Sequence, residues 1–437
     1  MKLVWTEVLL MILALSAALA AWAGEAALSL SEAVRYAAEN APGLAIERTT
    51  EEIRVLEERN SRYKLLPNLD LTTTNGLRGT SSDRGASPTQ PWSSLLMLSL
   101  IEYLYDNGES LTRIRIASLK SERARLSVLK TREELSLQVA QEFYLYSLSN
   151  ELIEVKRQQK ISIEKQYASL SQEYLQGFKT KQDYLRLKAR LQRSVLDVLA
   201  AESKRDQAEI QLNKILGVQS EDGKKLKFIP LRASDMLKKI PETLPVLENT
   251  YLYRIQQLDA QIDDKTVDLS RRKIWPEASL SSGVTYQFQD YLNAPTGYAS
   301  SSTNWNVLLT LTYKIWDWGN LRRDASIAQS KALNEAHDRK KNWFEQRAKI
   351  EVLGEEMQRL SSSFSLPKEL LAMEDETYTR LSANYREGKI PYLDLITGMD
   401  NLLDARVNYY TIYFNLLSKF AEYQSYEGKL YETLAHQ

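Results

Sequence analysis

The sequence predicts a mainly α-helical protein that also carries four membrane-type β-strands and is built as an internal duplication. Three observations predict this fold class. Long stretches without proline have the apolar spacing of amphipathic helices. Four shorter stretches alternate apolar and polar residues, as half-exposed strands do. Several short motifs also recur at a nearly constant offset, which is the mark of a repeat.

The composition argues against several classes of function. The 437 residues include 57 basic and 57 acidic side chains, a balance that gives no support to a nucleic-acid partner. There are two histidines and no cysteine, and no HExxH, CxxC, P-loop or GxGxxG pattern. We therefore expect no catalytic residues, no metal and no cofactor, and we do not expect an enzyme. An exported enzyme on a helical scaffold is a distant alternative.

Residues 1–23 are predicted to be a signal peptide. Lys2 supplies a positive start, residues 8–21 are apolar, and residues 21–23 offer small side chains at the two positions that a signal peptidase reads. An N-terminal membrane anchor is the alternative. The mature chain is expected to begin near Gly24, without disulfide bonds or a cysteine for lipid attachment.

An internal repeat organises the rest of the chain. The stretch "LYDNG" aligns with "IWDWG" and places Asp106 on Asp317, an offset of 317 − 106 = 211 residues. The stretch "EYLQGFKTKQDY" aligns with "NYREGKIPYLDL" at the same offset and places Gly177 on Gly388. We therefore predict a first repeat, a linker and a second repeat, which cover residues 24–217, 218–245 and 246–437.

Helix signals define the first repeat. Ser29 to Glu32 has the form of a capping box and opens a helix over 29–66, which Pro67 ends. Residues 110–176 contain no proline and would form one helix of roughly 100 Å. A tight turn at Gly177 then leads into a returning helix over 180–216, with Thr180 and Asp183 at its start. This returning helix has the apolar spacing of a coiled coil.

The second repeat has the same order of elements, but different residues interrupt and end its helices. Pro367 should kink or break its long helix. Gly388 makes the turn, and Pro391 suits the first turn of the returning helix. The linker 218–245 is charged and proline-containing, and it is expected to form an irregular belt against the helices.

Two strand pairs are predicted, one in each repeat. Residues 277–291 and 304–317 have the period and the length of membrane strands. The first-repeat pair, 68–77 and 93–106, alternates less regularly. The face of the last strand that is predicted to contact lipid consists of Trp305, Val307, Leu309, Leu311 and Tyr313.

The number of strands predicts an oligomer. An open sheet in lipid leaves backbone groups unpaired at a cost of several kcal/mol each, and membrane barrels need about eight strands or more. Four strands must therefore join those of other copies, which gives a cyclic oligomer. Two strand-to-helix junctions, marked by Asp106 with Gly108 and Asp317 with Gly319, would connect a β-barrel to an α-helical barrel. An ordinary soluble hairpin is the alternative for each strand pair.

These elements resemble the TolC-like outer-membrane efflux protein (outer membrane factor) family over the whole mature chain. The resemblance rests on "LLPNLDL", the "YDNG" and "WDWG" junctions, "EYLQGFKTKQD", "NYREGKIPYLDL" and the duplication. It implies a homotrimer with a twelve-stranded barrel in outer-membrane lipid and a helical barrel in the periplasm. It also implies a passive channel for efflux or type I secretion, docked through a periplasmic adaptor protein to an inner-membrane transporter. The alternative is a periplasmic coiled-coil adaptor or structural protein without a pore.

The resemblance also places a gate at the two helix turns of the periplasmic tip. Asp183, Tyr385 and Asp394 match residues that govern opening in the family, next to the turn glycines Gly177 and Gly388. Two positions depart from the pattern, because Ile390 stands where some members have arginine and Thr397 where some have a second aspartate. Helix capping is the simpler role for the two aspartates, and packing is the simpler role for the tyrosine.

Overall fold

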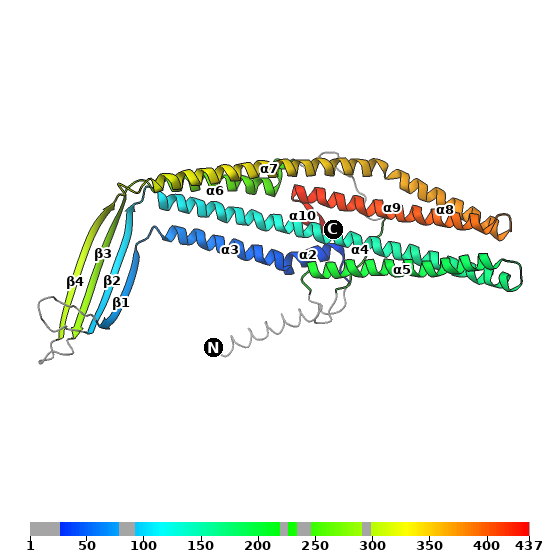
Figure 1. Ribbon diagram of the computed structural model, residues 1–437, viewed down its shortest axis with the longest axis horizontal. Coiled ribbons are helices and arrows are strands. Elements are labelled where there is room, and N and C mark those ends of the chain that lie inside the picture. The colour runs from blue at the N-terminus through cyan, green and yellow to red at the C-terminus, as the bar shows by residue number, and fades with distance from the viewer. Residues whose placement is uncertain (1–26, 78–91, 219–225, 234–245, 291–298, 437) are drawn as a thin grey trace. The chain divides into compact units, whose positions relative to one another are not determined.

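The computed structural model describes residues 27–77, 92–218, 226–233, 246–290 and 299–436. The predicted signal peptide lies outside these residues, as do most of the two loops between paired strands and most of the linker. Figure 1 shows the described elements in chain order. They are α2 (Leu30–Asn40), α3 (Pro42–Tyr63), β1 (Asn68–Leu77), β2 (Trp92–Tyr105), α4 (Glu109–Leu175), α5 (Lys181–Ile215), η2 (Leu247–Asn249), α6 (Tyr251–Arg272), β3 (Glu277–Asp290), β4 (Ala299–Thr312), α7 (Asn320–Ser363), α8 (Ser365–Arg386), α9 (Tyr392–Glu427) and α10 (Leu430–Ala435).

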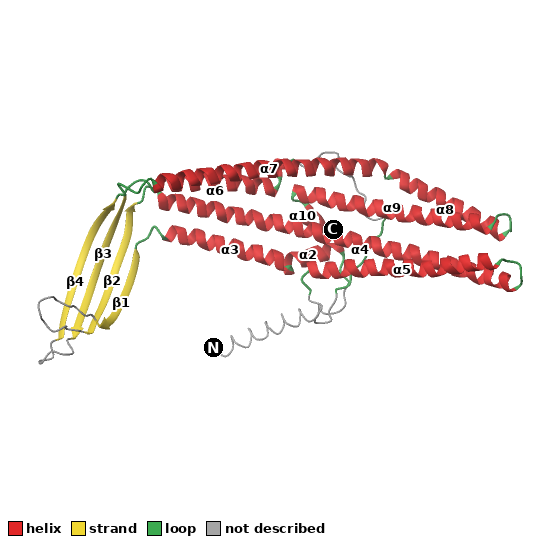
Figure 2. Cartoon of the chain, viewed as in Figure 1, coloured by secondary structure: helices red, strands yellow, loops and turns green. Residues whose placement is uncertain are grey.

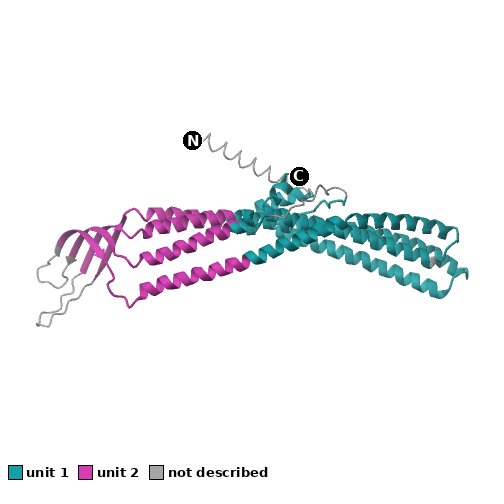
Figure 3. Ribbon diagram, turned by 90° about the horizontal axis from the view of Figure 1, so that it is seen from above, with its two compact units in different colours: residues 1–47, 128–253, 343–437 teal, residues 48–127, 254–342 magenta. Residues whose placement is uncertain are grey.

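The chain forms two compact units (Figure 3). One unit contains residues 1–47, 128–253 and 343–437, and the other contains residues 48–127 and 254–342. The second unit holds all four strands, which form one antiparallel sheet in the order β1-β2-β3-β4 (Figure 2). The central pair therefore joins a strand of the first repeat to a strand of the second.

The prediction of one helix over residues 29–66 is wrong in one respect, because this stretch forms two helices. Ser29 forms the predicted capping box with Glu32, but α2 ends at Asn40 and α3 begins at Pro42. Ala41 between them is extended, with φ −67° and ψ 126°. A residue before proline is driven out of the helical region by the proline ring, so Pro42 sets this break.

The long helices follow the sequence closely. Helix α4 is continuous over 67 residues. The second long helix is interrupted as predicted, but at Phe364, which lies between α7 and α8 and has φ −66° and ψ −26°. Pro367 is the third residue of α8, where a missing N–H costs little. Pro391 is the N-cap residue of α9 and not a residue of its first turn.

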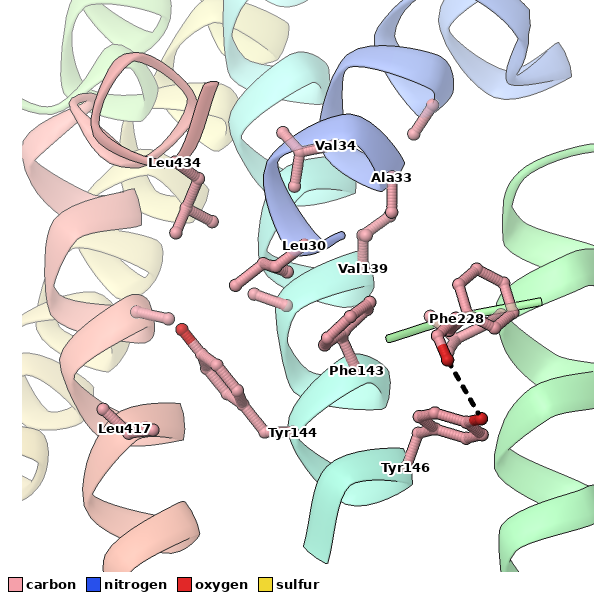
Figure 4. Close-up of a cluster of buried hydrophobic side chains, with 14 of the residues drawn as sticks. Leu30, Ala33, Val34, Val139, Phe143, Tyr144, Tyr146, Phe228, Leu417 and Leu434 are labelled. Carbon is pink, nitrogen blue, oxygen red and sulfur yellow. Dashed lines mark hydrogen bonds between the residues drawn. The ribbon is translucent and has the colours of Figure 1, made fainter. Parts of the chain in front are cut away.

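A buried aromatic group marks the main core of the first unit (Figure 4). Phe143 and Tyr146 on α4 meet Phe228 from the linker, with ring centroids 6.1 Å and 5.8 Å from that ring. The Tyr146 hydroxyl donates to the Phe228 carbonyl oxygen at 3.3 Å. Leu28 pairs in parallel with Phe228 through one isolated bridge. The described part of the linker thus lies against the helices, as the predicted belt should.

The short helix α10 was not predicted from the sequence. The Tyr431 backbone N–H donates to the Glu133 carboxylate at 3.2 Å, and the Arg35 Nε donates to the Ala435 carbonyl oxygen at 2.8 Å. A carboxylate thus faces the start of the helix and a guanidinium faces its end, the arrangement that a helix dipole favours. Glu133 is only 2% exposed, and this burial raises its pKa above the ordinary value despite the hydrogen bond from Tyr431.

Replacement of Phe228 tests the belt. Phe228→Ala should destabilise the first unit by about 3–5 kcal/mol, because it leaves a cavity beside Phe143 and Tyr146. Limited proteolysis should then cut the linker faster than in the parent protein. Ile229→Ala is the matched control, since Ile229 is 53% exposed and should change the rate little. Equal cleavage rates for the two variants would show that the belt is not held by this contact.

Candidate functional site

One face of the sheet is apolar from edge to edge. The strand register aligns four side chains in a row across the sheet, and the next row repeats the pattern with one serine. Because partners in an antiparallel pair point to the same side, these residues share one face. Several of them are strongly exposed in the single chain, with Trp305 at 77% and Leu71 at 68%. The two rows are Leu71, Leu98, Val284 and Trp305, and Leu69, Leu100, Ser282 and Val307.

The opposite face is largely polar. Threonine, serine, asparagine and glutamine dominate it on β1, β3 and β4. Three residues that break the alternation of β2, Leu95, Met97 and Ile101, all lie on this polar face. The irregular pattern therefore adds apolar side chains to the polar face and leaves the apolar face almost complete. Glu102, opposite Leu280, is the charged residue on the apolar side of β2.

The last strand differs from its prediction at both ends. Strand β4 begins at Ala299 and ends at Thr312, so Tyr313 lies just beyond it and the prediction of Tyr313 as a strand residue is wrong. Trp305, Val307, Leu309 and Leu311 do lie within the strand, on its apolar face. Strand β3 pairs along its full length with β4, and Thr312 pairs with its first residue, Glu277. No residue of β3 remains to pair with Tyr313.

The two junctions after the strands share one hydrogen-bonding pattern. The Asp106 carboxylate accepts from the backbone N–H groups of Gly108 at 3.0 Å and Ser110 at 2.7 Å. The Asp317 carboxylate accepts from Gly319 at 2.8 Å and Leu321 at 2.7 Å. Each aspartate therefore satisfies N–H groups at the start of a long helix that would otherwise lack partners.

Both junctions also use two successive residues with positive φ. These are Asn107 at 58° with Gly108 at 72°, and Trp318 at 60° with Gly319 at 78°. At the first junction the glycine also makes room, because a Cβ at Gly108 would lie 2.8 Å from the Arg272 guanidinium. Arg272 donates to the Asn107 carbonyl oxygen. The sequence pattern around Arg272 does not predict this contact, which the structure shows to hold the junction.

The carboxylate at the first junction is favoured in its ionised form. Burial acts to raise the pKa of Asp106, but the hydrogen bonds from Ser110 and Gly108 outweigh it, so the pKa lies below its ordinary value. At the second junction the hydrogen bond from Leu321 lowers the pKa of Asp317 in the same direction. Both caps are therefore fully charged at neutral pH.

The two predicted helix turns are built alike. The Phe178 N–H donates to the Glu173 carbonyl oxygen at 2.8 Å, and the Gly177 N–H donates to that of Tyr174 at 3.0 Å. In the second turn Lys389 and Gly388 donate in the same way, at 2.9 Å and 3.0 Å. This is the Schellman arrangement, in which the glycine must be left-handed, and φ is 81° at Gly177 and 71° at Gly388.

The structure places the three predicted gate residues around these turns. The Asp183 carboxylate accepts from the Thr180 hydroxyl at 2.7 Å and its backbone N–H donates back to that hydroxyl at 3.2 Å, so Asp183 takes part in capping α5. Asp394 lies exposed in the first turn of α9. Tyr385 is half-buried, and this burial raises its pKa, with smaller and opposite effects from Lys179 and Glu173 of the other turn. Tyr385 therefore lies close to the turn between α4 and α5.

No group of histidine, cysteine, aspartate and glutamate residues in the described part of the chain could hold a metal ion. None of the described helices is both long and apolar enough to cross a membrane.

Several solved structures with the same fold are described as outer-membrane channels. The chain matches the CmeC outer membrane channel of Campylobacter jejuni with a TM-score of 0.81 and 14% identity, covering 92% of this chain and 86% of that one. It matches the outer membrane protein VceC of Vibrio cholerae with a TM-score of 0.77 and 13% identity, covering 92% and 96%. It matches the MtrE channel of Neisseria gonorrhoeae, solved in its open state, with a TM-score of 0.73 and 15% identity, covering 93% and 88%. A search of curated proteins found no match.

The sequence itself matches the family model for outer membrane efflux proteins twice, over residues 44–218 and 254–418. These two stretches cover most of the chain, so the protein belongs to the outer membrane efflux protein family. The predictions of the family, of the mainly helical fold with four strands per chain and of an outer-membrane channel are confirmed. The alternative of a periplasmic protein without a pore is not supported.

The junction caps make a prediction that depends on pH. Asp106→Ala should cost about 1 kcal/mol of stability at pH 7, because it removes an N-terminal cap, whereas Asp106→Asn should cost less. A carboxyl group with a lowered pKa stabilises the fold fully above its unfolded pKa of about 3.8 and loses this effect as the pH falls through the folded value. Unfolding midpoints in denaturant should therefore differ between the parent and Asp106→Ala at pH 7 and converge at pH 2. A constant difference would contradict an ionised cap.

Proposed function

We propose that this protein is the outer-membrane channel of a tripartite efflux system and that it works as a passive homotrimeric duct. Three chains would supply twelve strands to one barrel in the outer membrane, and their helices would form the helical barrel in the periplasm. A periplasmic adaptor protein and an inner-membrane transporter would complete the system and provide its energy. We propose that the channel itself catalyses no reaction.

The observation that carries this proposal is the four-stranded sheet. Its apolar face suits lipid and its polar face suits an aqueous lumen, as in known membrane barrels. Strands β1 and β4 each have a partner on one side only within the described chain, so both edges of the sheet can pair with other copies. The family description names efflux, which favours efflux over type I secretion.

The proposed repeats are residues 24–217 and 246–437, with 218–245 as the linker. Each of the two matched stretches falls within one repeat apart from a single terminal residue, which supports this division. We further propose that Asp183, Tyr385 and Asp394 form the gate of the periplasmic tip. The effect of Lys179 and Glu173 of the first turn on the pKa of Tyr385 supports this role, since it places Tyr385 of the second hairpin near the first turn.

Two matched variants of β4 test the duct. Leu309→Arg puts a charge on the apolar face, where an arginine costs about 2–4 kcal/mol at the membrane midplane and less toward the membrane edges, whereas Thr310→Arg puts the same charge on the polar face. The parent and Thr310→Arg should need detergent for extraction from outer membranes, run as trimers and form channels in planar bilayers. Leu309→Arg should fail to assemble. If carbonate extracted the parent protein from the membranes as a monomer, the proposed function would be wrong.

The gate has its own test. Asp183→Ala combined with Tyr385→Phe should raise the single-channel conductance, because the polar groups of two proposed gate residues are lost. Thr180→Ala is the control, since it removes the cap of α5 and leaves the Asp183 carboxylate in place. If Thr180→Ala raised the conductance equally, Asp183 would be a capping residue only. If neither variant changed the conductance, the gate assignment would be wrong.

A further inference from the structure

An ion pair joins the two returning helices within one subunit. The Arg190 guanidinium on α5 donates to the Asp400 carboxylate on α9. These residues are 210 positions apart in the sequence and belong to different repeats. Their side chains are 22% and 47% exposed, so the pair lies half-buried at the helix surface.

This ion pair is the one that crosses between the two helical hairpins. Among the ion pairs of the described residues, the others near the turns stay within one hairpin. Lys179 pairs with Glu173 inside the first turn, and Lys389 pairs with Glu387 inside the second. Farther from the turns, the Arg406 guanidinium pairs with Asp375 in the α8–α9 hairpin. Within the described part of the chain, only Arg190 and Asp400 connect the α4–α5 hairpin to the α8–α9 hairpin through opposite charges, since Arg406 reaches α4 through a hydrogen bond to the uncharged Gln158 at 3.2 Å.

A small apolar cluster lies next to the ion pair. It contains Ile163 and Leu170 of α4, Leu187 of α5 and Met399 of α9, all buried. Leu187 precedes Arg190 by one helical turn, and Met399 is the neighbour of Asp400 in the sequence. The Arg190 Nε is buried without a hydrogen-bond partner among the described residues. Separation of α5 from α9 would therefore expose apolar surface and break the ion pair in one movement.

The ion pair also lies where a gate can be controlled. Arg190 is seven residues beyond Asp183, and Asp400 is six beyond Asp394, which places both about 10 Å along their helices from the predicted gate residues. Ile390 in the second turn is apolar and offers no charge for an ion pair there. The cross-hairpin charge pair of this chain therefore lies about two helical turns away from the turns themselves.

The ion pair is not repeated by the duplication. The offset of 211 residues relates Arg190 to Asn401 and Asp400 to Ala189, neither of which carries a charge. A contact between Asn401 of α9 and Ala189 of α5, which the repeat would make equivalent, therefore has no attraction between opposite charges. A trimer would contain three such ion pairs, one within each subunit.

We propose that Arg190 and Asp400 form a latch that keeps the two hairpins of a subunit together and the duct narrow. This proposal rests on the proposed function, because it assigns a further gate contact in the same channel. Opening separates α5 from α9 and breaks the latch in each subunit. The latch acts in addition to the residues at the turns and does not need them.

Single channels in planar bilayers test the latch. Arg190→Gln and Asp400→Asn should each raise the ratio of open to closed time roughly tenfold, because an ion pair at the helix surface gives a factor of about two and three copies multiply. The charge exchange Arg190→Asp with Asp400→Arg should bring the ratio back toward the parent value. Arg193→Gln removes an exposed charge one turn further along α5 and should change nothing.

A second measurement uses the absence of cysteine from the whole sequence. Arg190→Cys with Asp400→Cys should be joined within one subunit by a short bismaleimide, and the joined channel should stay closed. The latch would be wrong if all the charge variants kept the parent ratio of open to closed time, or if cross-linked channels opened freely. Either result would leave the proposed function as a channel unaffected. A parent protein that forms no channels would overturn the proposed function and the latch with it.

Discussion

The structure depends on the need to pair the edges of one small sheet. Strands β1 and β4 each leave one row of backbone donors and acceptors without a partner inside the described chain. The apolar face, with Trp305 and Leu309 largely exposed, belongs in lipid, where unpaired backbone groups are very costly. Closure with other copies satisfies both demands together. The long helices must then follow the same rotational symmetry as the strands, because α4 and α7 begin directly after the sheet at their aspartate caps.

The duplication reproduces geometry more faithfully than it reproduces side chains. Four helix ends carry the same pair of hydrogen bonds around a left-handed glycine, and they fall into two sets related by the repeat. Gly177 corresponds to Gly388, and Gly217 corresponds to Gly428. The packing between these ends has diverged. Gly398 of α9, where a Cβ would lie 2.4 Å from Leu381, corresponds to the buried Leu187 of α5. The two hairpins therefore turn alike but pack differently.

Local signals in the sequence predicted most of the fold. The capping box at Ser29, the alternation of the strands and the turn glycines each act over a few residues, so their patterns can be read directly. The break at Pro42 was missed because the apolar spacing continues on both sides of it. Contacts between distant segments could not be predicted in this way. Nothing in the local pattern around Glu133 points to α10, and nothing around Arg190 points to Asp400, because both contacts depend on how the helices pack. The family resemblance supplied the gate residues for the same reason.

The second junction carries a tryptophan where the first carries an asparagine. Asparagine tolerates a positive φ, whereas a bulky side chain at φ 60° pays about 1–2 kcal/mol in backbone strain. Trp318 is 77% exposed and its ring meets Trp316 edge-on at 5.7 Å, so burial within the subunit does not offset this strain. Indole rings partition to the boundary between lipid and water, the level at which a barrel meets its helices. Loss of the Trp318 side chain would therefore relieve the backbone strain, but it would also remove an indole ring suited to that boundary.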